Sequence, residues 1–127
     1  MKKSNEEKTL TRAEMEIMTI LWDNGAAMST HSIIERLPEP KPAYSTIATF
    51  LKILTNKGFI DHKKAEASSK TFLFFPLISR AEYTSQFMKE VKSTFFGNSF
   101  KSMLRFFAER EEIEDDELKE IMELIKK

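Results

Sequence analysis

Residues 44–60 constrain the fold of this chain more than any other segment, because they combine an apolar helical stripe, a polar face and a glycine stop. Four apolar residues recur at the i, i+3, i+4 and i+7 spacing of one buried helix side: Ile47, Phe50, Leu51 and Leu54. Gly58 follows where a left-handed helix cap is favoured, and a strand-like segment begins after it. A helix, a glycine stop and a lysine-bearing hairpin are typical of a winged helix-turn-helix.

Length and composition restrict the class of protein. A chain of 127 residues forms one domain, or one small domain with an appendage. It has no cysteine, which excludes disulfides, thiolate metal ligands and a cysteine nucleophile. No apolar run approaches the roughly 18 residues of a membrane-spanning helix, and the N-terminal residues lack an apolar signal region. We therefore expect a cytoplasmic protein without membrane insertion.

The charges are distributed unevenly although they sum to zero, with 20 Lys and Arg against 20 Asp and Glu. Residues 1–80 hold 12 basic and 9 acidic side chains, whereas residues 81–127 hold 8 and 11. Within residues 41–70, six lysines stand against two acidic residues, a net charge of +4. The basic charge therefore collects around the predicted helix and hairpin, as expected of a nucleic-acid-binding segment.

Capping signals and turn residues divide the first half of the chain. A capping box at Thr11 opens a first helix that ends at Gly25. Ala27-Met28 is expected to form a one- or two-residue strand, and Ser29 to cap a second, short helix. The prolines within residues 38–42 break that helix before the third one begins.

The second half begins with a hairpin and continues as helices. Two strands are predicted at residues 59–64 and 70–75, joined by a small polar tip. A second capping box at Ser79 opens a helix that extends to about Phe96, and two more helices follow. The predicted fold class is mainly α with a small β-hairpin. Its predicted parts are a flexible N-terminus at residues 1–9, a winged-helix DNA-binding domain at residues 10–78 and a helical dimerisation region at residues 79–127.

The candidate DNA-binding residues lie on the third helix and on the hairpin. Short hydroxyl and amide side chains can touch base edges, lysines neutralise phosphates, and a helix N-terminus offers backbone amides to a phosphate. The helix contributes Tyr44, Ser45, Thr46, Thr49, Lys52, Asn56 and Lys57. The hairpin contributes Lys63, Lys64 and Lys70, which would follow the DNA backbone as a wing. The alternatives are an ordinary solvated helix face and lysines that only protect a sheet edge from aggregation.

Apolar residues at helical spacing indicate a dimerisation surface in the C-terminal region. Short helices with apolar stripes bury more surface when a second copy packs on them, so we expect a homodimer. The predicted surface consists of Tyr83, Phe87, Val91, Phe95, Phe100, Met103, Leu104, Phe107, Leu118, Ile121, Met122 and Ile125. Alternatively, the phenylalanines of this region line a pocket for a small molecule, which would make the protein a ligand-sensing regulator.

The sequence favours neither catalysis nor a metal site. His31 and His62 are the only histidines, and neither has a cysteine or a paired carboxylate at ligand spacing. The acidic residues at 109–117 precede a helix, where negative charge is favoured. No grouping of nucleophile and base and no glycine-rich phosphate loop is visible in the sequence. We therefore expect no enzymatic activity and no cofactor.

Three segments together point to one family. Residues 10–22 end in Trp22 and resemble the opening helix of that family. Residues 44–58 are similar to its recognition helix, in which Tyr-Thr-Thr-Val-x-Thr-x-Leu and a Lys-Gly stop recur. Residues 74–83 resemble its segment between the wing and the dimerisation helices. In this order and spacing, they resemble the penicillinase repressor (BlaI/MecI) family of bacterial transcriptional regulators, from about Leu10 to the C-terminus.

The resemblance implies a homodimeric repressor of a palindromic promoter operator, in control of an operon of the resistance or stress type. It also implies a membrane sensor-protease as a partner, whose signal leads to a cut at an Asn-Phe bond in the dimerisation region. Phe106-Phe107 occupies that position here, so the sequence departs from the family at the regulatory cleavage site. Copper-responsive relatives carry a cysteine motif that this chain lacks, which excludes that mode of regulation.

A winged helix that binds only other proteins is the remaining alternative, because fold alone does not dictate function.

Overall fold

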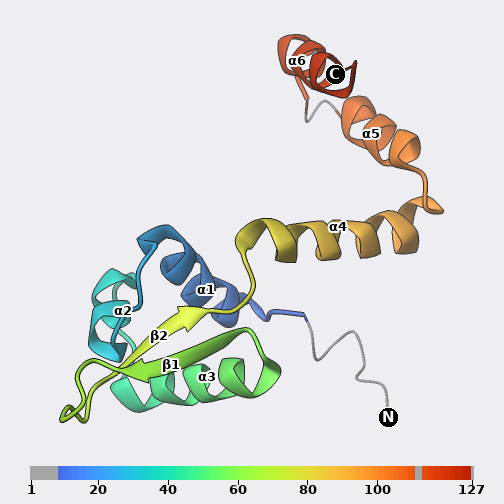
Figure 1. Cartoon of the computed structure of the whole chain (residues 1–127). Helices are drawn as coiled ribbons and strands as arrows, with labels where there is room; N and C mark the ends of the chain where they lie inside the picture. The colour runs from blue at the N-terminus through green and yellow to red at the C-terminus, as the bar shows by residue number, and fades with distance from the viewer. Residues whose placement is uncertain (1–8, 111–112, 127) are drawn as a thin grey trace, which may run out of the picture. The chain divides into compact units, whose positions relative to one another are not determined.

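The computed structural model describes residues 9–110 and 113–126. Residues 1–8 of the predicted N-terminal segment and the side chain of Ile125 lie outside this description. In chain order the elements are α1 (Arg12–Asn24), α2 (Thr30–Arg36), α3 (Tyr44–Lys57), β1 (Ile60–Lys64), β2 (Phe72–Pro76), α4 (Arg80–Phe96), α5 (Phe100–Glu109) and α6 (Asp115–Lys126) (Figure 1). This order confirms the predicted fold class. The chain divides into two compact units, the first ending at Tyr83 and the second beginning at Thr84.

The helix ends in the first unit follow from local capping. The Thr11 hydroxyl accepts a hydrogen bond from the Glu14 amide, and the Glu14 carboxylate accepts one from the Thr11 amide, which confirms the predicted capping box. Gly25 ends α1 with φ 73°, in the left-handed region where glycine carries no steric penalty. Ser29 caps α2 by accepting a hydrogen bond from the Ser32 amide, as predicted.

Helix α3 buries the stripe that its sequence predicts. Ile47, Leu51 and Leu54 are buried, whereas Phe50 is only half-buried at the edge of the stripe. Gly58 closes the helix with φ 86°, and its amide donates to the carbonyl groups of the last turn. The helix is therefore anchored along one side, and the opposite side faces away from the core.

The hairpin is antiparallel and pairs Ile60 with Pro76, His62 with Phe74 and Lys64 with Phe72. Strand β1 begins one residue later than predicted, because the amide of Phe59 donates to the Leu54 carbonyl in the turn that closes α3. Strand β2 likewise begins two residues later than predicted. Met28 bridges to Phe74 through two backbone hydrogen bonds of 2.9 and 2.7 Å, which confirms the short strand predicted there.

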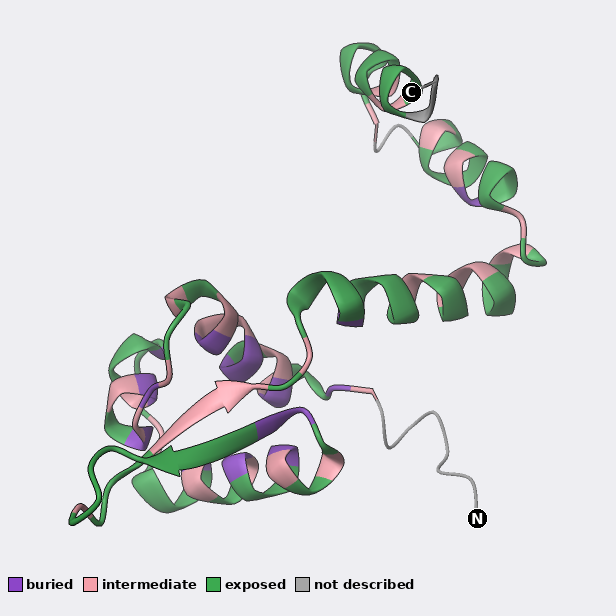
Figure 2. Cartoon of the chain, in the orientation of Figure 1, coloured by how far each residue is buried: buried purple, intermediate pink, exposed green. Residues whose placement is uncertain are grey.

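The core of the first unit lies between the three helices and the start of β1, where the buried residues concentrate (Figure 2). Tyr83 belongs to this core. It is 5% exposed, its hydroxyl accepts a hydrogen bond of 2.9 Å from the Leu10 amide, and its ring meets Phe59 edge to face. The assignment of Tyr83 to the dimerisation surface was therefore wrong. The first unit also extends beyond the predicted boundary at residue 78, because this tyrosine closes its core.

The second unit contains the rest of α4 with α5 and α6. Gly97 and Asn98 both have positive φ, and they interrupt the helices where the sequence predicted a break. The rings of Phe96 and Phe106 meet edge to face, with centroids 5.5 Å apart, and Phe107 contacts Phe106 in the same manner at 5.6 Å. Met103 is buried within the single chain. Among the described residues of this unit, the large apolar side chains that stay exposed are Phe87, Phe95, Phe100, Phe106, Phe107, Met122 and Leu124.

Candidate nucleic-acid interface

The outward side of α3 carries most of the predicted DNA-binding residues. Ser45, Thr49, Lys52 and Asn56 are exposed there, opposite the buried stripe, and Tyr44 and Thr46 are exposed in the first turn. The Thr49 hydroxyl donates a hydrogen bond of 2.9 Å to the Ser45 carbonyl, so its proton is used within the helix. Ile53 is also exposed on this side of the helix, which was predicted to be polar.

The N-terminal end of α3 is open to an anion. The preceding residue, Ala43, has a methyl side chain that cannot accept hydrogen bonds from the first amides of the helix. The amides of Thr46 and Ile47 bond to the Ala43 carbonyl, whereas those of Tyr44 and Ser45 precede the first helical acceptor. These two amides, with the partial positive charge of the helix end, suit a backbone phosphate of DNA.

The hairpin lysines fall on different faces because side chains alternate along a strand. His62 contacts the rings of Phe72 and Phe74 at 4.8 and 5.7 Å, on the face that also carries Lys64. Lys63 lies on the other face, with its ammonium 5.9 Å from the centre of the Phe75 ring. Only the His62 face is continuous with α3.

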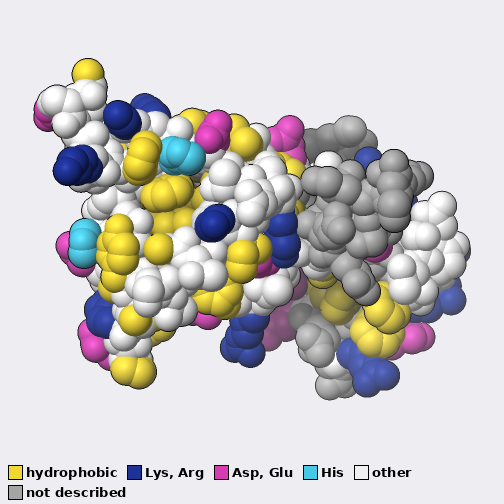
Figure 3. All heavy atoms as spheres, turned by 90° about the horizontal axis from the view of Figure 1, so that it is seen from below, with side chains coloured by type: hydrophobic (Ala, Val, Ile, Leu, Met, Phe, Trp, Pro, Cys, Tyr) yellow, Lys and Arg dark blue, Asp and Glu magenta, His cyan; other side chains and the backbone are white. Residues whose placement is uncertain are grey.

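Two hollows lie where the hairpin meets the helices. The first, of about 220 Å³, lies between α3 and the hairpin and is lined by Lys52 and Asn56 together with His62. The second, of about 250 Å³, lies at the start of α3 and is lined by Tyr44 and Lys70, among others. Figure 3 shows this side of the domain, with lysines gathered towards the hairpin tip and with histidine and hydrophobic side chains between polar groups. The structure thus brings both parts of the predicted site onto one surface.

Sequence reasoning missed the two histidines as members of this surface. The ring of His31, on α2, lies 4.9 Å from that of Tyr44, and His62 borders the hollow beside Lys52. Each had been considered only as a metal ligand. Their positions in the sequence could have revealed them, since His31 lies in the helix before α3 and His62 lies in the strand after it.

Lys57 lies away from the surface that α3 shares with the hairpin. Its ammonium is 2.8 Å from the Glu14 carboxylate and also donates to the Thr9 carbonyl at 3.3 Å. Burial alone would raise the pKa of Glu14, but hydrogen bonds from Lys57 and Thr11 and the charge of Lys57 hold it below its usual value. The prediction that Lys57 neutralises a phosphate was therefore wrong, because its charge is committed to a carboxylate that is 2% exposed.

Lys41 is also used within the domain, where its ammonium donates to the Glu35 and Leu37 carbonyls at the end of α2. Of the six lysines in residues 41–70, two are thus held internally, and Lys63 lies on the far face of the hairpin. The other three lysines of this segment, Lys52, Lys64 and Lys70, lie on the surface that α3 shares with the hairpin.

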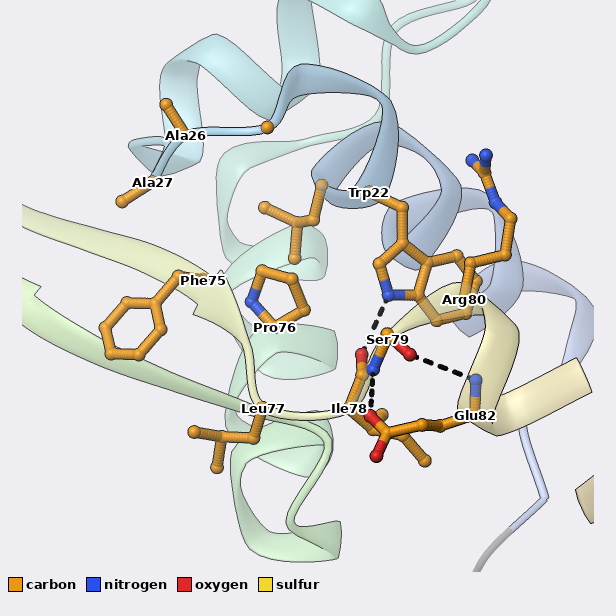
Figure 4. Close-up of a pocket in the computed structure, with 12 residues that line it drawn as sticks. Trp22, Ala26, Ala27, Phe75, Pro76, Leu77, Ile78, Ser79, Arg80 and Glu82 are labelled. Carbon is orange, nitrogen blue, oxygen red and sulfur yellow. Dashed lines mark hydrogen bonds between the residues drawn. The ribbon is translucent and has the colours of Figure 1, made fainter.

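A depression of about 600 Å³ lies between the end of α1 and the segment that leads from β2 into α4 (Figure 4). The Trp22 indole N–H donates to the Ile78 carbonyl at 2.9 Å, and the Arg80 guanidinium lies over the indole ring while pairing with Asp23. Ser79 and Glu82 exchange hydrogen bonds of 2.9 and 3.0 Å, which confirms the second predicted capping box. These contacts fasten the first turn of α4 to the end of α1.

Two kinds of feature are absent from residues 9–110 and 113–126 of the chain. None of its helices combines the length and the apolar character needed to cross a membrane. Within the same residues, no three potential metal-ligating side chains are grouped closely enough to hold an ion.

The three-helix core, the hairpin wing and the outward side of α3 define a winged helix-turn-helix protein. The penicillinase repressor family matches residues 10–127. The chain belongs to this family of transcriptional repressors.

Named relatives agree with this assignment. Methicillin resistance regulatory protein MecI of Staphylococcus aureus strain N315 is 30% identical over 124 residues, which cover 97% of this chain and 98% of MecI. The penicillinase repressor of Bacillus licheniformis is 24% identical over 117 residues, or 91% of this chain and 88% of that protein. The predicted family is confirmed. The chain is accordingly a DNA-binding transcriptional repressor and not an enzyme.

Solved structures support the fold. The solution structure of the DNA-binding domain of the repressor BlaI matches with a TM-score of 0.51 and 28% identity, and the match covers 65% of this chain and 94% of that one. The hsRosR complex structure matches with a TM-score of 0.54, covering 85% of this chain and 92% of that chain. Its identity is only 16%, so this second likeness concerns the fold alone.

Proposed function

We propose that two copies of the chain bind a palindromic operator and thereby occlude a promoter in the cytoplasm. Each copy places the outward side of α3 in a major groove and lays its hairpin along the DNA backbone. The observation that carries this proposal is the shared surface of α3 and the hairpin, with three lysines and an open helix N-terminus around short polar side chains. A dimer doubles the phosphate contacts that this modest charge provides.

Exposed apolar side chains of the second unit support the proposed dimer. Phe95 is 73% exposed and Phe100 is 49% exposed, values that place large apolar groups in water unless another surface covers them. The dimerisation surface that we propose comprises Phe87, Val91, Phe95, Phe100, Leu104, Phe107, Leu118, Ile121 and Met122. Met103 is not part of this surface, because the single chain already buries it.

Titration of the full-length protein against promoter DNA tests the proposed function. The probe is the promoter upstream of its own or a neighbouring gene, and a scrambled duplex of equal length is the control. Specific binding should be tighter than non-specific binding by about 10³-fold or more, and it should weaken steeply as salt rises. Equal, weak affinity for both duplexes would contradict a specific repressor and would favour a winged helix that binds only proteins.

We propose that a membrane sensor-protease, the partner implied by the family, supplies the signal that relieves repression. A cut at the family's cleavage position would here divide Phe106 from Phe107 within α5, whose hydrogen-bonded backbone must first open locally. Mass spectrometry of the repressor from cells exposed to a cell-wall antibiotic distinguishes two outcomes. Fragments that end at Phe106 would support cleavage, and an intact chain on a derepressed promoter would exclude it.

A further inference from the structure

Two apolar groups lie in line on the outward side of α3. Ile53 is 37% exposed although it is a large hydrophobic residue on a surface that otherwise carries polar side chains. Thr49 lies one helical turn before it, at the i, i+4 spacing that makes side chains neighbours. Because the Thr49 hydroxyl is turned back to the Ser45 carbonyl, its methyl group is the part of the side chain left to meet a ligand.

The composition of α3 limits how it can distinguish bases. The helix contains no arginine, the residue whose fork most often reads guanine in the major groove. Asn56 is its only amide side chain, and Lys52 its only lysine outside the Glu14 ion pair. Among the four bases, only thymine presents a methyl group in the major groove, and apolar side chains recognise it by contact.

We propose that the apolar groups of Thr49 and Ile53 contact thymine methyl groups in the major groove and thereby select thymines in each half of the operator. This inference rests on the proposed function, since it assumes that α3 enters a major groove. The thymine methyl group is covered by the Thr49 methyl or by the Ile53 side chain, and both apolar surfaces leave water. Burial of one methyl group corresponds to an affinity difference of about fourfold. Ile53 is thus a residue that determines sequence specificity.

The experiment first selects a preferred duplex from a randomised pool with the full-length wild-type protein. Each thymine of the selected duplex is then replaced by uracil, which deletes only the 5-methyl group and leaves base pairing unchanged. The affinities of wild type, Ile53→Ala and Thr49→Ser for these duplexes are measured at one salt concentration. Thr49→Ser keeps the hydroxyl group and removes the methyl group, so it isolates the apolar contact. Leu77→Ala removes a comparable exposed apolar side chain outside α3 and serves as the matched control.

Wild type should lose about fourfold in affinity at one or more thymine positions of each half-site. Ile53→Ala should abolish the loss at one of these positions and Thr49→Ser at another, while Leu77→Ala should keep both losses. Equal non-specific affinity of all four proteins shows that the variants are folded. The inference is overturned if no uracil substitution weakens binding, or if both α3 variants retain the wild-type losses. Failure to enrich any sequence from the pool would instead contradict the proposed function itself.

Discussion

The ion pair between Glu14 and Lys57 joins two helices of the first unit. It ties the first turn of α1 to the last turn of α3, and the Glu14 side chain is almost fully buried. Lys57→Met leaves that carboxylate without its partner, so the free energy of unfolding should fall by about 2–4 kcal/mol in urea titrations. Lys52→Met, on the exposed side of the same helix, should change it by no more than about 0.5 kcal/mol. Equal effects of the two substitutions would contradict the assigned role.

The same pair predicts how stability depends on pH. Because the pKa of Glu14 is lowered on folding, its contribution to stability is complete above the unfolded pKa of about 4.3 and is lost as pH falls through the folded value. Wild type should therefore be more stable than Glu14→Gln at pH 6, and the difference should shrink as the pH is lowered below about 4. Urea titrations of both proteins across this range measure it. A difference that stays constant down to pH 3 would contradict the lowered pKa.

The hydroxyl of Tyr83 gives a second prediction for a single residue. Tyr83→Phe removes the buried acceptor of the Leu10 amide, and an unsatisfied buried amide costs about 1–3 kcal/mol. Thermal unfolding of the full-length protein should show the loss. Tyr44→Phe makes the same chemical change at an exposed position and should leave stability within about 0.5 kcal/mol.

At the level of elements, the hairpin separates its lysines by strand alternation. Lys64→Ala should weaken binding to all DNA sequences alike and reduce the slope of log affinity against log salt by about 1, because one phosphate contact is lost. Lys63→Ala, next in sequence but over the Phe75 ring, should leave the slope unchanged. Affinity titrations at several salt concentrations compare the two variants. A larger change from Lys63→Ala would show that the opposite face of the hairpin meets DNA.

Helix α3 should contribute more to the choice between DNA sequences than to the electrostatic attraction for DNA. Thr49→Ala removes the methyl group that we propose to contact thymine, so it should reduce the preference for operator over scrambled DNA by about fourfold, or about 0.8 kcal/mol, while non-specific affinity stays unchanged. Competition titrations with both duplexes measure this ratio. Proportional losses on the two duplexes would mean that Thr49 contacts the backbone and not the bases.

At the level of the whole molecule, repression should depend on association of two chains. Phe95→Glu places a charge on the proposed dimerisation surface, and it should shift the protein to monomers and weaken operator binding at least tenfold. Ser93→Glu adds the same charge across α4 from Phe95 and should remain dimeric. Light scattering measures the mass, and titration measures the affinity. A monomeric wild type would contradict the dimer, and an unaffected Phe95→Glu dimer would contradict this surface.

The sequence by itself determined the fold of the first unit and the existence of the reading helix. Capping boxes at Thr11 and Ser79, the glycine at position 58 and the apolar stripe of residues 47–54 act over a few residues, so their outcome is independent of distant contacts. The same local signals placed most of the candidate DNA-binding residues on one exposed helix side.

Only the tertiary structure decided which of these residues are free to act. Lys57 and Tyr83 looked like members of the reading and dimerisation surfaces, but their partners are Glu14 and the Leu10 amide, 43 and 73 residues away in sequence. Lys63 and Lys64 would lie on opposite faces of any strand, but only the packing of the hairpin beside α3 decided that the face of Lys64 adjoins that helix. Long-range pairing determines such roles because a side chain's charge or hydroxyl is available only if no buried group elsewhere in the chain has already bound it.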